Sequence, residues 1–379
     1  MNNLVFDVSF KIFLLFCINL FTGGIAVANG ELWSQQRRFI HGIFRKFGIG
    51  KSKFEHQIED ESRAFIEEVT SLNGEWFDPT HLLQNAVSNV ICAIVFGKRF
   101  EYSDEKFKYW LELSNRHVKL SVSNYPVIFL PSLRYLPRGA NVFRDMLNNF
   151  SKLCNFAAEA IVDHKRHRDP DHPRDFIDSY LQEISINQEE ASGSDVKFSR
   201  LNDGTLTATI IQLFSAGTDT TALTFRWLIL YMTIDVAIQA RVHEEIDAVV
   251  GRNRLPKLAD RPNLKYTQAV MLEIQRMASI SRLGAFHKCS KTTTVRGLTI
   301  PQGTVVVPNL WAVHRDPEVW PEPSKFKPER FLDKNGDVVT RDELIPFSIG
   351  EFIIIVKPLR SKRVNKRVKQ QTNKQTGIS

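Results

Sequence analysis

The sequence predicts a mainly α-helical protein that also contains small β-sheets. The longest apolar stretch, Leu206–Met232, is too long for a strand and is typical of a buried helix. Further on, Thr292–Ile300 and Thr304–Val307 are rich in β-branched residues and flank a turn sequence, which predicts short strands. Of the 379 residues 43% are hydrophobic and the mean hydropathy is −0.21, which excludes a disordered chain and a polytopic membrane protein.

Four further segments predict helices, each with its own character. Glu31–Phe47 has a basic face, and Asn141–Lys165 has an amphipathic period. Leu82–Phe96 is apolar on nearly all sides, so we expect it to be buried. Tyr266–Met277 is the last helix expected before the strands.

The segments between these helices contain residues that interrupt regular structure. Tyr125–Pro137 is rich in proline and aromatic residues and predicts a connector. His167–Pro173 predicts a polar break, and Ile186–Gly204 predicts a polar linker. Four prolines fall between Pro317 and Pro328, so this stretch should be ordered but not helical.

The first 23 residues form an atypical amino-terminal segment, which overlaps an uncharged run of 17 residues, Ile12–Ala28. That length is at the lower limit for a helix that spans a bilayer, and Asn19 and the Gly23–Gly24 pair weaken this interpretation. A buried strand-and-turn segment is the alternative, and the sequence leaves both open.

The net charge of +8 comes from the carboxyl-terminal residues 357–379, which contain no acid. Residues 1–356 carry 42 basic and 42 acidic side chains and are formally neutral, so no nucleic-acid-binding fold is expected. A tail of this composition favours disorder, with attraction to nucleic acid or anionic lipid as the alternative. Its basic residues are Lys357, Arg360, Lys362, Arg363, Lys366, Arg367, Lys369 and Lys374.

The cysteines are few and scattered. No Cys-x-x-Cys pair occurs, so a disulfide scaffold or a structural zinc site is not expected. This pattern favours a reducing compartment. The four residues are Cys17, Cys92, Cys154 and Cys289.

One motif stands in the middle of the long apolar helix. Its small residues, Ala216 and Gly217, would let a flat ligand approach the backbone closely. An acid in such a segment is costly to bury without a partner, so Asp219 beside Thr220 predicts a pair that handles protons, with a carboxyl source and a hydroxyl relay. The alternative is a kinked core helix in which Asp219 is simply hydrogen-bonded.

A second motif pairs Glu273 with Arg276, which lie three residues apart on one helix face. The usual interpretation is a solvated surface pair. Arg330, at the end of the proline-rich segment, could dock on the same carboxylate and make a buried, multiply hydrogen-bonded staple.

A third motif places Trp33 and Arg37 one helical turn apart. The indole N–H and the guanidinium are both donors only, which suits an anionic ligand such as a carboxylate. A solvated basic helix is the alternative.

These motifs occur in an order that resembles the cytochrome P450 heme-thiolate monooxygenases, and most closely their microsomal family-two branch. The resemblance extends from about Gly24 to Gly350, which we expect to form one partial domain. It rests on WSQQR at 33–37, AGTDTT at 216–221, EIQR at 273–276 and PERF at 328–331.

The resemblance implies a heme b cofactor and assigns roles residue by residue. Ala216 and Gly217 would face the heme, and Asp219 and Thr220 would deliver protons as the catalytic pair. The remaining assignments are heme propionates for Trp33, Arg37 and His287, the substrate pocket for Phe214, Leu283 and Ala285, and the structural staple for Glu273, Arg276 and Arg330.

The same resemblance implies an activity. The family inserts oxygen from O2 into a lipophilic small molecule, receives electrons from NADPH through a reductase, and resides on the cytosolic face of the endoplasmic reticulum membrane. We expect no nucleic-acid partner.

The chain departs from the family at both ends. The family's iron ligand is a cysteine in a position that Ile354 occupies here, so no metal ligand is expected and the chain itself should be inactive. We also expect the fold to lack the amino-terminal anchor, the first strands and the carboxyl-terminal heme-ligand region, with 351–379 as a disordered basic tail. The alternatives are a non-catalytic remnant of the fold, and a helical protein that uses the tail at a membrane surface or on a partner.

Overall fold

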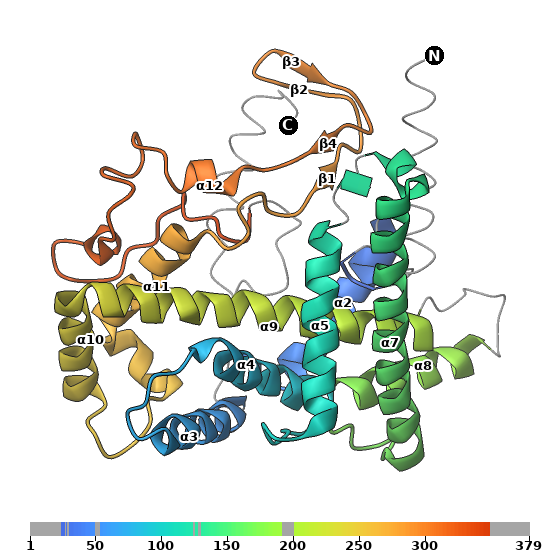
Figure 1. Cartoon of the computed structure of the whole chain (residues 1–379), viewed down its shortest axis with the longest axis horizontal. Coiled ribbons are helices and arrows are strands. Elements are labelled where there is room, and N and C mark those ends of the chain that lie inside the picture. The colour runs from blue at the N-terminus through green and yellow to red at the C-terminus, as the bar shows by residue number, and fades with distance from the viewer. Residues whose placement is uncertain are drawn as a thin grey trace. The chain divides into compact units, whose positions relative to one another are not determined.

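The computed structural model describes residues 24–26, 28, 30–49, 54–123, 126–127, 130–191 and 201–348 (Figure 1). Ile354 and the basic tail lie outside the described residues, as does most of the uncharged run Ile12–Ala28. The chain divides into two compact units, Met1–Ala222 and Leu223–Ser379, and the single domain expected from about Gly24 to Gly350 stays a prediction. Helix α9 (Asp203–Ile234) begins in the first unit and ends in the second.

The prediction of a mainly α-helical chain is confirmed in the first unit, where all the described regular elements are helices. The helices are α2 (Gly30–Lys46), α3 (Glu55–Ser71), α4 (Pro79–Val95), α5 (Glu105–Ser123), the short 3-10 helix η2 (Pro131–Tyr135), α7 (Pro137–His167), α8 (Phe176–Ala191) and the first part of α9. Helices α2, α4, α7 and α9 agree with predicted helices to within a few residues at their ends, whereas α3, α5 and α8 were not predicted individually. Helix α8 extends into the segment predicted as a polar linker, which began at Ile186.

The start of α4 shows why this sequence forms a helix earlier than its apolar run indicates. The Asp78 carboxylate accepts a hydrogen bond of 2.9 Å from the Thr80 N–H, and Pro79 takes the first helical position. On the helix, Leu83 and Val87 are buried in a cluster with Ala222 of α9. Ser88, Asn89, Cys92 and Val95 are also buried, but the remaining sides of α4 are only partly covered, so the prediction of a helix buried on nearly all sides is too strong.

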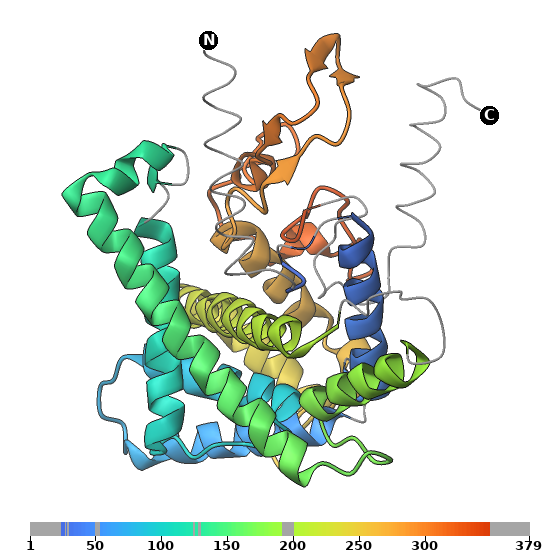
Figure 2. The same cartoon turned by 90° about the vertical axis from the view of Figure 1, so that its right-hand side faces the viewer.

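Helices α5 and α7 lie side by side (Figures 1 and 2). Aromatic rings connect them to α9. Trp110 of α5 is 1% exposed. Its ring stacks on Phe156 of α7 at 4.5 Å between centroids and meets Phe214 of α9 edge-on at 5.1 Å. These contacts fix the face of α9 on which Phe214 lies.

The second unit contains the rest of α9 and a set of shorter elements. The elements are α10 (Val236–Val249), the 3-10 helices η3 (Leu258–Asn263) and η4 (Pro328–Phe331), α11 (Lys265–Ala278) and α12 (Leu310–Val313). The core of this unit joins Ile274 of α11 to Ile238 of α10, while Trp320 and Phe331 form a second cluster with Ala269.

The predicted strands form two small antiparallel sheets in this unit, which confirms the minor β content. Strand β1 (His287–Lys288) pairs with β4 (Val305–Val306). Strands β2 (Thr293–Val295) and β3 (Leu298–Ile300) form a hairpin, visible in Figure 2. Its two turn residues, Arg296 and Gly297, both have positive φ angles, of 50° and 82°, as a tight hairpin turn requires.

No helix among the described residues is by itself long and apolar enough to cross a bilayer. Helices α9 and α10 meet that criterion only as a pair, by length and composition, and they are bent by 109° where they meet.

Candidate functional site

The motif in α9 places Ala216 and Thr220 on one exposed face of the helix. The Thr220 hydroxyl donates a hydrogen bond of 2.7 Å to the Ala216 carbonyl oxygen, one turn earlier. The sequence suggested that this part of the helix is buried throughout, and Thr220 corrects that view. A hydroxyl on an exposed, small-residue face can meet a ligand that lies against the helix.

Asp219 has different surroundings from its neighbour Thr220. Its carboxyl is half-buried, and its Oδ1 accepts a hydrogen bond of 3.3 Å from Gln84 Nε2 of α4. Gln84 in turn exchanges hydrogen bonds of 3.3 Å with Asn115 of α5. Burial raises the pKa of Asp219, and the bond from Gln84 offsets part of that rise. Asp219 therefore holds its proton more readily than an exposed aspartate does.

Sequence reasoning missed the amides that hold Asp219. A signal was present, since Gln84 is a polar residue inside the apolar run of α4. The partners lie far apart in the sequence, however, so only the packing of α4, α5 and α9 brings them together.

Gly217 packs against helix α4, whereas the sequence suggested that it would face a flat ligand. A Cβ atom at Gly217 would lie 2.7 Å from Ile91 Cδ1 of α4, so the missing side chain is what lets α4 pack there. Beside it, the Ser88 hydroxyl of α4 donates a bond of 3.2 Å to Thr218 Oγ1. Ala216 keeps its place on the exposed face, and the cofactor-binding roles of both residues stay predictions.

The three residues assigned to the substrate pocket lie in different settings. Phe214 is completely buried against Trp110 in the first unit. Leu283, with 49% of its surface exposed, and the exposed Ala285 flank Gly284 in the second unit. Their roles stay predictions.

The candidate propionate donors on α2 share one face of the helix, as their spacing predicts. The Arg37 guanidinium lies over the Trp33 ring, 5.2 Å from its centroid. Burial, followed by Arg37 and Arg45, lowers the pKa of His41 on the same helix. This helix therefore favours anions. His287, the third candidate, is half-buried in β1 of the second unit, opposite Val306 of β4.

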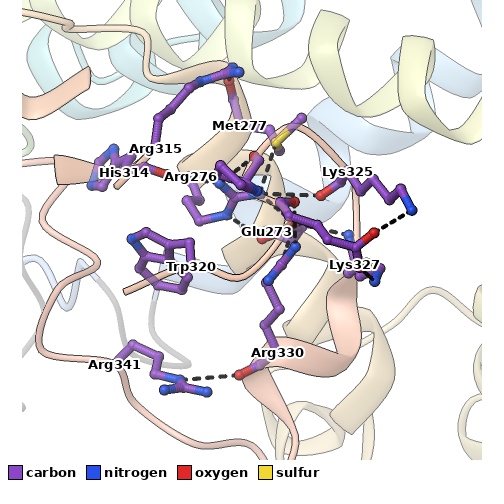
Figure 3. A network of polar contacts seen from close by, with 12 residues as sticks. Glu273, Arg276, Met277, His314, Arg315, Trp320, Lys325, Lys327, Arg330 and Arg341 are labelled. Carbon is purple, nitrogen blue, oxygen red and sulfur yellow. Dashed lines mark hydrogen bonds and ion pairs between the residues drawn. The ribbon is translucent and has the colours of Figure 1, made fainter. Parts of the chain in front are cut away.

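The structure brings the predicted staple together in the second unit, around a carboxylate that is 0% exposed (Figure 3). Arg276 Nε donates to Glu273 Oε2 at 2.7 Å, and Arg276 Nη2 donates to Glu273 Oε1 at 2.7 Å. Arg330 Nε lies 3.4 Å from Glu273 Oε1. The Lys327 N–H adds a bond of 2.9 Å to the same oxygen.

The rest of the Arg276 guanidinium ties α11 to the irregular segments that follow. Nη1 donates to the carbonyl oxygens of His314 and Pro323, at 2.8 and 2.9 Å, and Nη2 lies 3.3 Å from that of Lys325. The Trp320 ring packs beneath it, 5.4 Å from Cζ. Arg276 is thus the centre of the staple, and the solvated surface pair is excluded.

One further cluster has the composition of a metal site, but its side chains are hydrogen-bonded to groups of the protein. His164, Asp175 and Asp178 are buried within reach of one another in the first unit. Asp175 accepts from His164 Nε2 at 2.8 Å and from the Asp178 N–H at 2.9 Å, and Asp178 accepts from Arg174. These bonds join the end of α7 to the start of α8 and occupy the oxygens that a cation would need.

Comparison with known proteins decides between the family interpretation and a chance arrangement of motifs. The family model "Cytochrome P450" matches residues 15–351. The chain belongs to the cytochrome P450 family.

Among the curated P450s, the chain is 38% identical over 339 residues to "Cytochrome P450 2U1" of Bos taurus, covering 89% of this chain and 61% of the relative. It is 40% identical over 331 residues to "Cytochrome P450 2J1" of Oryctolagus cuniculus, covering 86% of this chain and 64% of the relative. The chain thus spans about three fifths of the length of these P450s.

P450 family membership supports heme b as the cofactor by resemblance, so the fit of the residues to heme can be examined. The exposed face at Ala216 and Thr220 and the donors of α2 suit the ring and its propionates. The family match ends at residue 351 and Ile354 lies outside the described residues, so the expectation that Ile354 takes the place of the cysteine ligand stays a prediction.

The three described cysteines lie in different surroundings. Burial raises the pKa of Cys92 well above its usual range and that of Cys154 to about 11, and Cys289 donates its S–H to the Lys291 carbonyl oxygen at 3.0 Å. None of the three lies in the sequence around position 354, and no step is assigned to a thiolate-bound iron in this chain.

Proposed function

We propose that this chain is built on the plan of a monooxygenase that inserts oxygen into a lipophilic small molecule, and that it does not turn over as it stands because Ile354 replaces the cysteine ligand. The proposal rests on the different surroundings of two neighbouring residues of α9. Asp219 is held by the Gln84 amide with its pKa raised, while Thr220 lies on the exposed face.

The residues of α9 support a proton path. Heme, when bound, would supply the redox chemistry of O2. The Asp219 carboxyl is the proton source, and the Thr220 hydroxyl, which already donates to Ala216, has acceptor capacity for a proton donor beside it. Trp33, Arg37 and His287 would bond the propionates.

The substrate and partners follow from the family and stay proposals, because the chain spans only about three fifths of its relatives. Phe214, Leu283 and Ala285 are apolar, which suits a lipophilic substrate. Electrons would come from NADPH through a reductase at the endoplasmic reticulum membrane.

Two other functions are favoured by specific observations. Ile354 favours a non-catalytic remnant of the fold, and the acid-free tail favours a protein that binds a membrane surface or a partner. Deleting residues 357–379 tests the latter, since liposome binding that falls with salt should vanish with the tail.

The experiment that tests the proposal combines heme titration with turnover. We expect the intact chain, supplied with heme, reductase and NADPH, to give no oxygenated product from lipophilic test substrates. Product above the level of a control without reductase would overturn the claim of inactivity. Heme uptake at a defined stoichiometry would favour a cofactor-binding P450 over a remnant that binds none.

A further inference from the structure

His314, which directly follows α12, is 0% exposed, and both nitrogens of its ring are hydrogen-bonded (Figure 3 shows its position beside Arg276 and Arg315). Nε2 lies 3.0 Å from the backbone nitrogen of Ile345, and Nδ1 lies 3.0 Å from the Ser279 hydroxyl oxygen. A backbone N–H can only donate, so Nε2 must be the unprotonated nitrogen that accepts.

Ser279 determines the state of the other nitrogen. It ends α11 in the left-handed conformation, with a φ of 40°, and its hydroxyl donates to the Arg276 carbonyl oxygen at 2.8 Å. The single hydroxyl proton is thus used, and the Ser279 oxygen must accept from His314 Nδ1–H. The hydrogen bonds therefore select one neutral tautomer of His314.

The charges around His314 favour the same neutral form. Arg276 of α11, which is paired with Glu273, donates to the His314 carbonyl oxygen at 2.8 Å, and Arg315 is the next residue along the chain. Burial, Arg276 and Arg315 together lower the pKa of His314 to about 4.

The bond to Ile345 holds a particular part of the chain. Leu344 packs against the cluster of Trp320 and Phe331, and Ile345 follows it. From Ile345 the sequence runs through Pro346–Gly350 toward position 354, where the family has its iron ligand.

We infer that His314 is a positioning residue that fixes where the chain enters the segment leading to position 354, by connecting the Ile345 amide through Ser279 to the Glu273–Arg276 pair. The inference concerns the polypeptide alone and holds whether or not the chain binds heme. It also explains why a buried histidine stands beside Arg276 and Arg315, since an apolar residue in its place would leave the Ile345 N–H without this acceptor.

Amide hydrogen exchange at Ile345 tests the inference without any cofactor. In His314→Leu the acceptor is lost, and we expect exchange at Ile345 to accelerate roughly tenfold. His314→Gln offers a carbonyl oxygen near the position of Nε2 and should restore most of the protection. The internal control is the Val339 amide of the same unit, which donates to the Phe331 carbonyl oxygen at 2.9 Å and should not change.

The unmodified chain gives a second readout, which does not depend on whether the variants fold. After correction for intrinsic exchange rates, protection at Ile345 should decrease as the pH falls through about 4, because protonated Nε2 cannot accept a hydrogen bond. Loss of protection at Ile345 but not at Val339 supports the inference. Equal change at both amides, or no change at Ile345 in His314→Leu or at low pH, overturns it.

Discussion

Glu273 and Arg276 form a two-pronged ion pair in which neither side chain has any exposed surface, with both N–O distances at 2.7 Å. Arg276 donates further hydrogen bonds to the carbonyl oxygens of His314, Pro323 and Lys325. The pair therefore sets the positions of segments that have no regular structure of their own, between α12 and η4.

Removing the carboxylate should destabilise the protein strongly. Glu273→Ala leaves Arg276 buried without its counter-ion, which costs about 3–5 kcal/mol in comparable sites. The midpoint of urea unfolding measures this loss. Glu322→Ala is the matched control, since Glu322 pairs with Lys325 and Lys327 at an exposed position and should cost under about 1 kcal/mol. Equal midpoints for the two variants would mean that the buried pair contributes no more than a surface pair.

His164 should stabilise the folded protein at low and neutral pH and lose this effect as the pH rises. Its Nδ1 lies 2.7 Å from the Ala160 carbonyl oxygen and its Nε2 lies 2.8 Å from Asp175, so both nitrogens face acceptors. Burial lowers the pKa of His164, but the hydrogen bond and charge of Asp175 outweigh it and raise the pKa above 6.5. The protonated form is thus favoured by folding, and its contribution is complete below pH 6.5 and is lost as the pH rises through the folded pKa.

His164→Gln is the variant that measures this contribution. The difference in unfolding free energy between the parent and His164→Gln should be largest below pH 6.5 and should shrink as the pH rises through the raised pKa of His164. His172→Gln is the control, because His172 pairs with Asp169 at an exposed position. A difference that stays constant with pH would show that His164 is neutral in the folded protein.

Gly217 and Ile91 should be energetically coupled. Alanine favours a helix interior over glycine by about 1 kcal/mol, but a Cβ at Gly217 would lie 2.7 Å from Ile91 Cδ1. We expect Gly217→Ala to lose most of that gain in the parent and to recover it in an Ile91→Ala background. Unfolding free energies of the four forms give the coupling. Additive effects would place the glycine's role elsewhere than in packing against α4.

Asp219 and Thr220 should affect the use of electrons more than binding. In a form with family-type termini that include the cysteine, Thr220→Ala should lower the product formed per NADPH consumed without weakening heme uptake. Asp219→Asn should slow proton supply while keeping the shape, by about 100-fold or more where general acid catalysis limits the rate. An unchanged ratio of product to NADPH in both variants would leave these residues with a purely structural role in α9.

The sequence predicted what depends on local spacing. Glu273 and Arg276 are three residues apart on one helix, and the strands around Gly297 follow from their β-branched residues and turn. Contacts between distant segments could not be derived in this way. Gln84 and Asp219 are 135 positions apart, so the amide that holds the acid becomes apparent only from the packing of α4 on α9.

Gly217 shows a second limit of sequence reasoning. A glycine in an apolar helix indicates close approach of some group, but not which one, and here the group is Ile91. His314 shows the same limit for polar residues, since its partners Ser279 and Ile345 lie 35 and 31 positions away.

The difference spectrum of the reduced protein with carbon monoxide tests most directly whether the chain is a P450 without its thiolate ligand. The intact chain, supplied with heme, should lack the absorption band of a thiolate-ligated complex, and Ile354→Cys, in which the sulfur returns to the family position, should gain part of it if the surrounding segment folds around heme. A full thiolate band in the intact chain would contradict the assignment, because it would require a sulfur ligand from elsewhere in the chain.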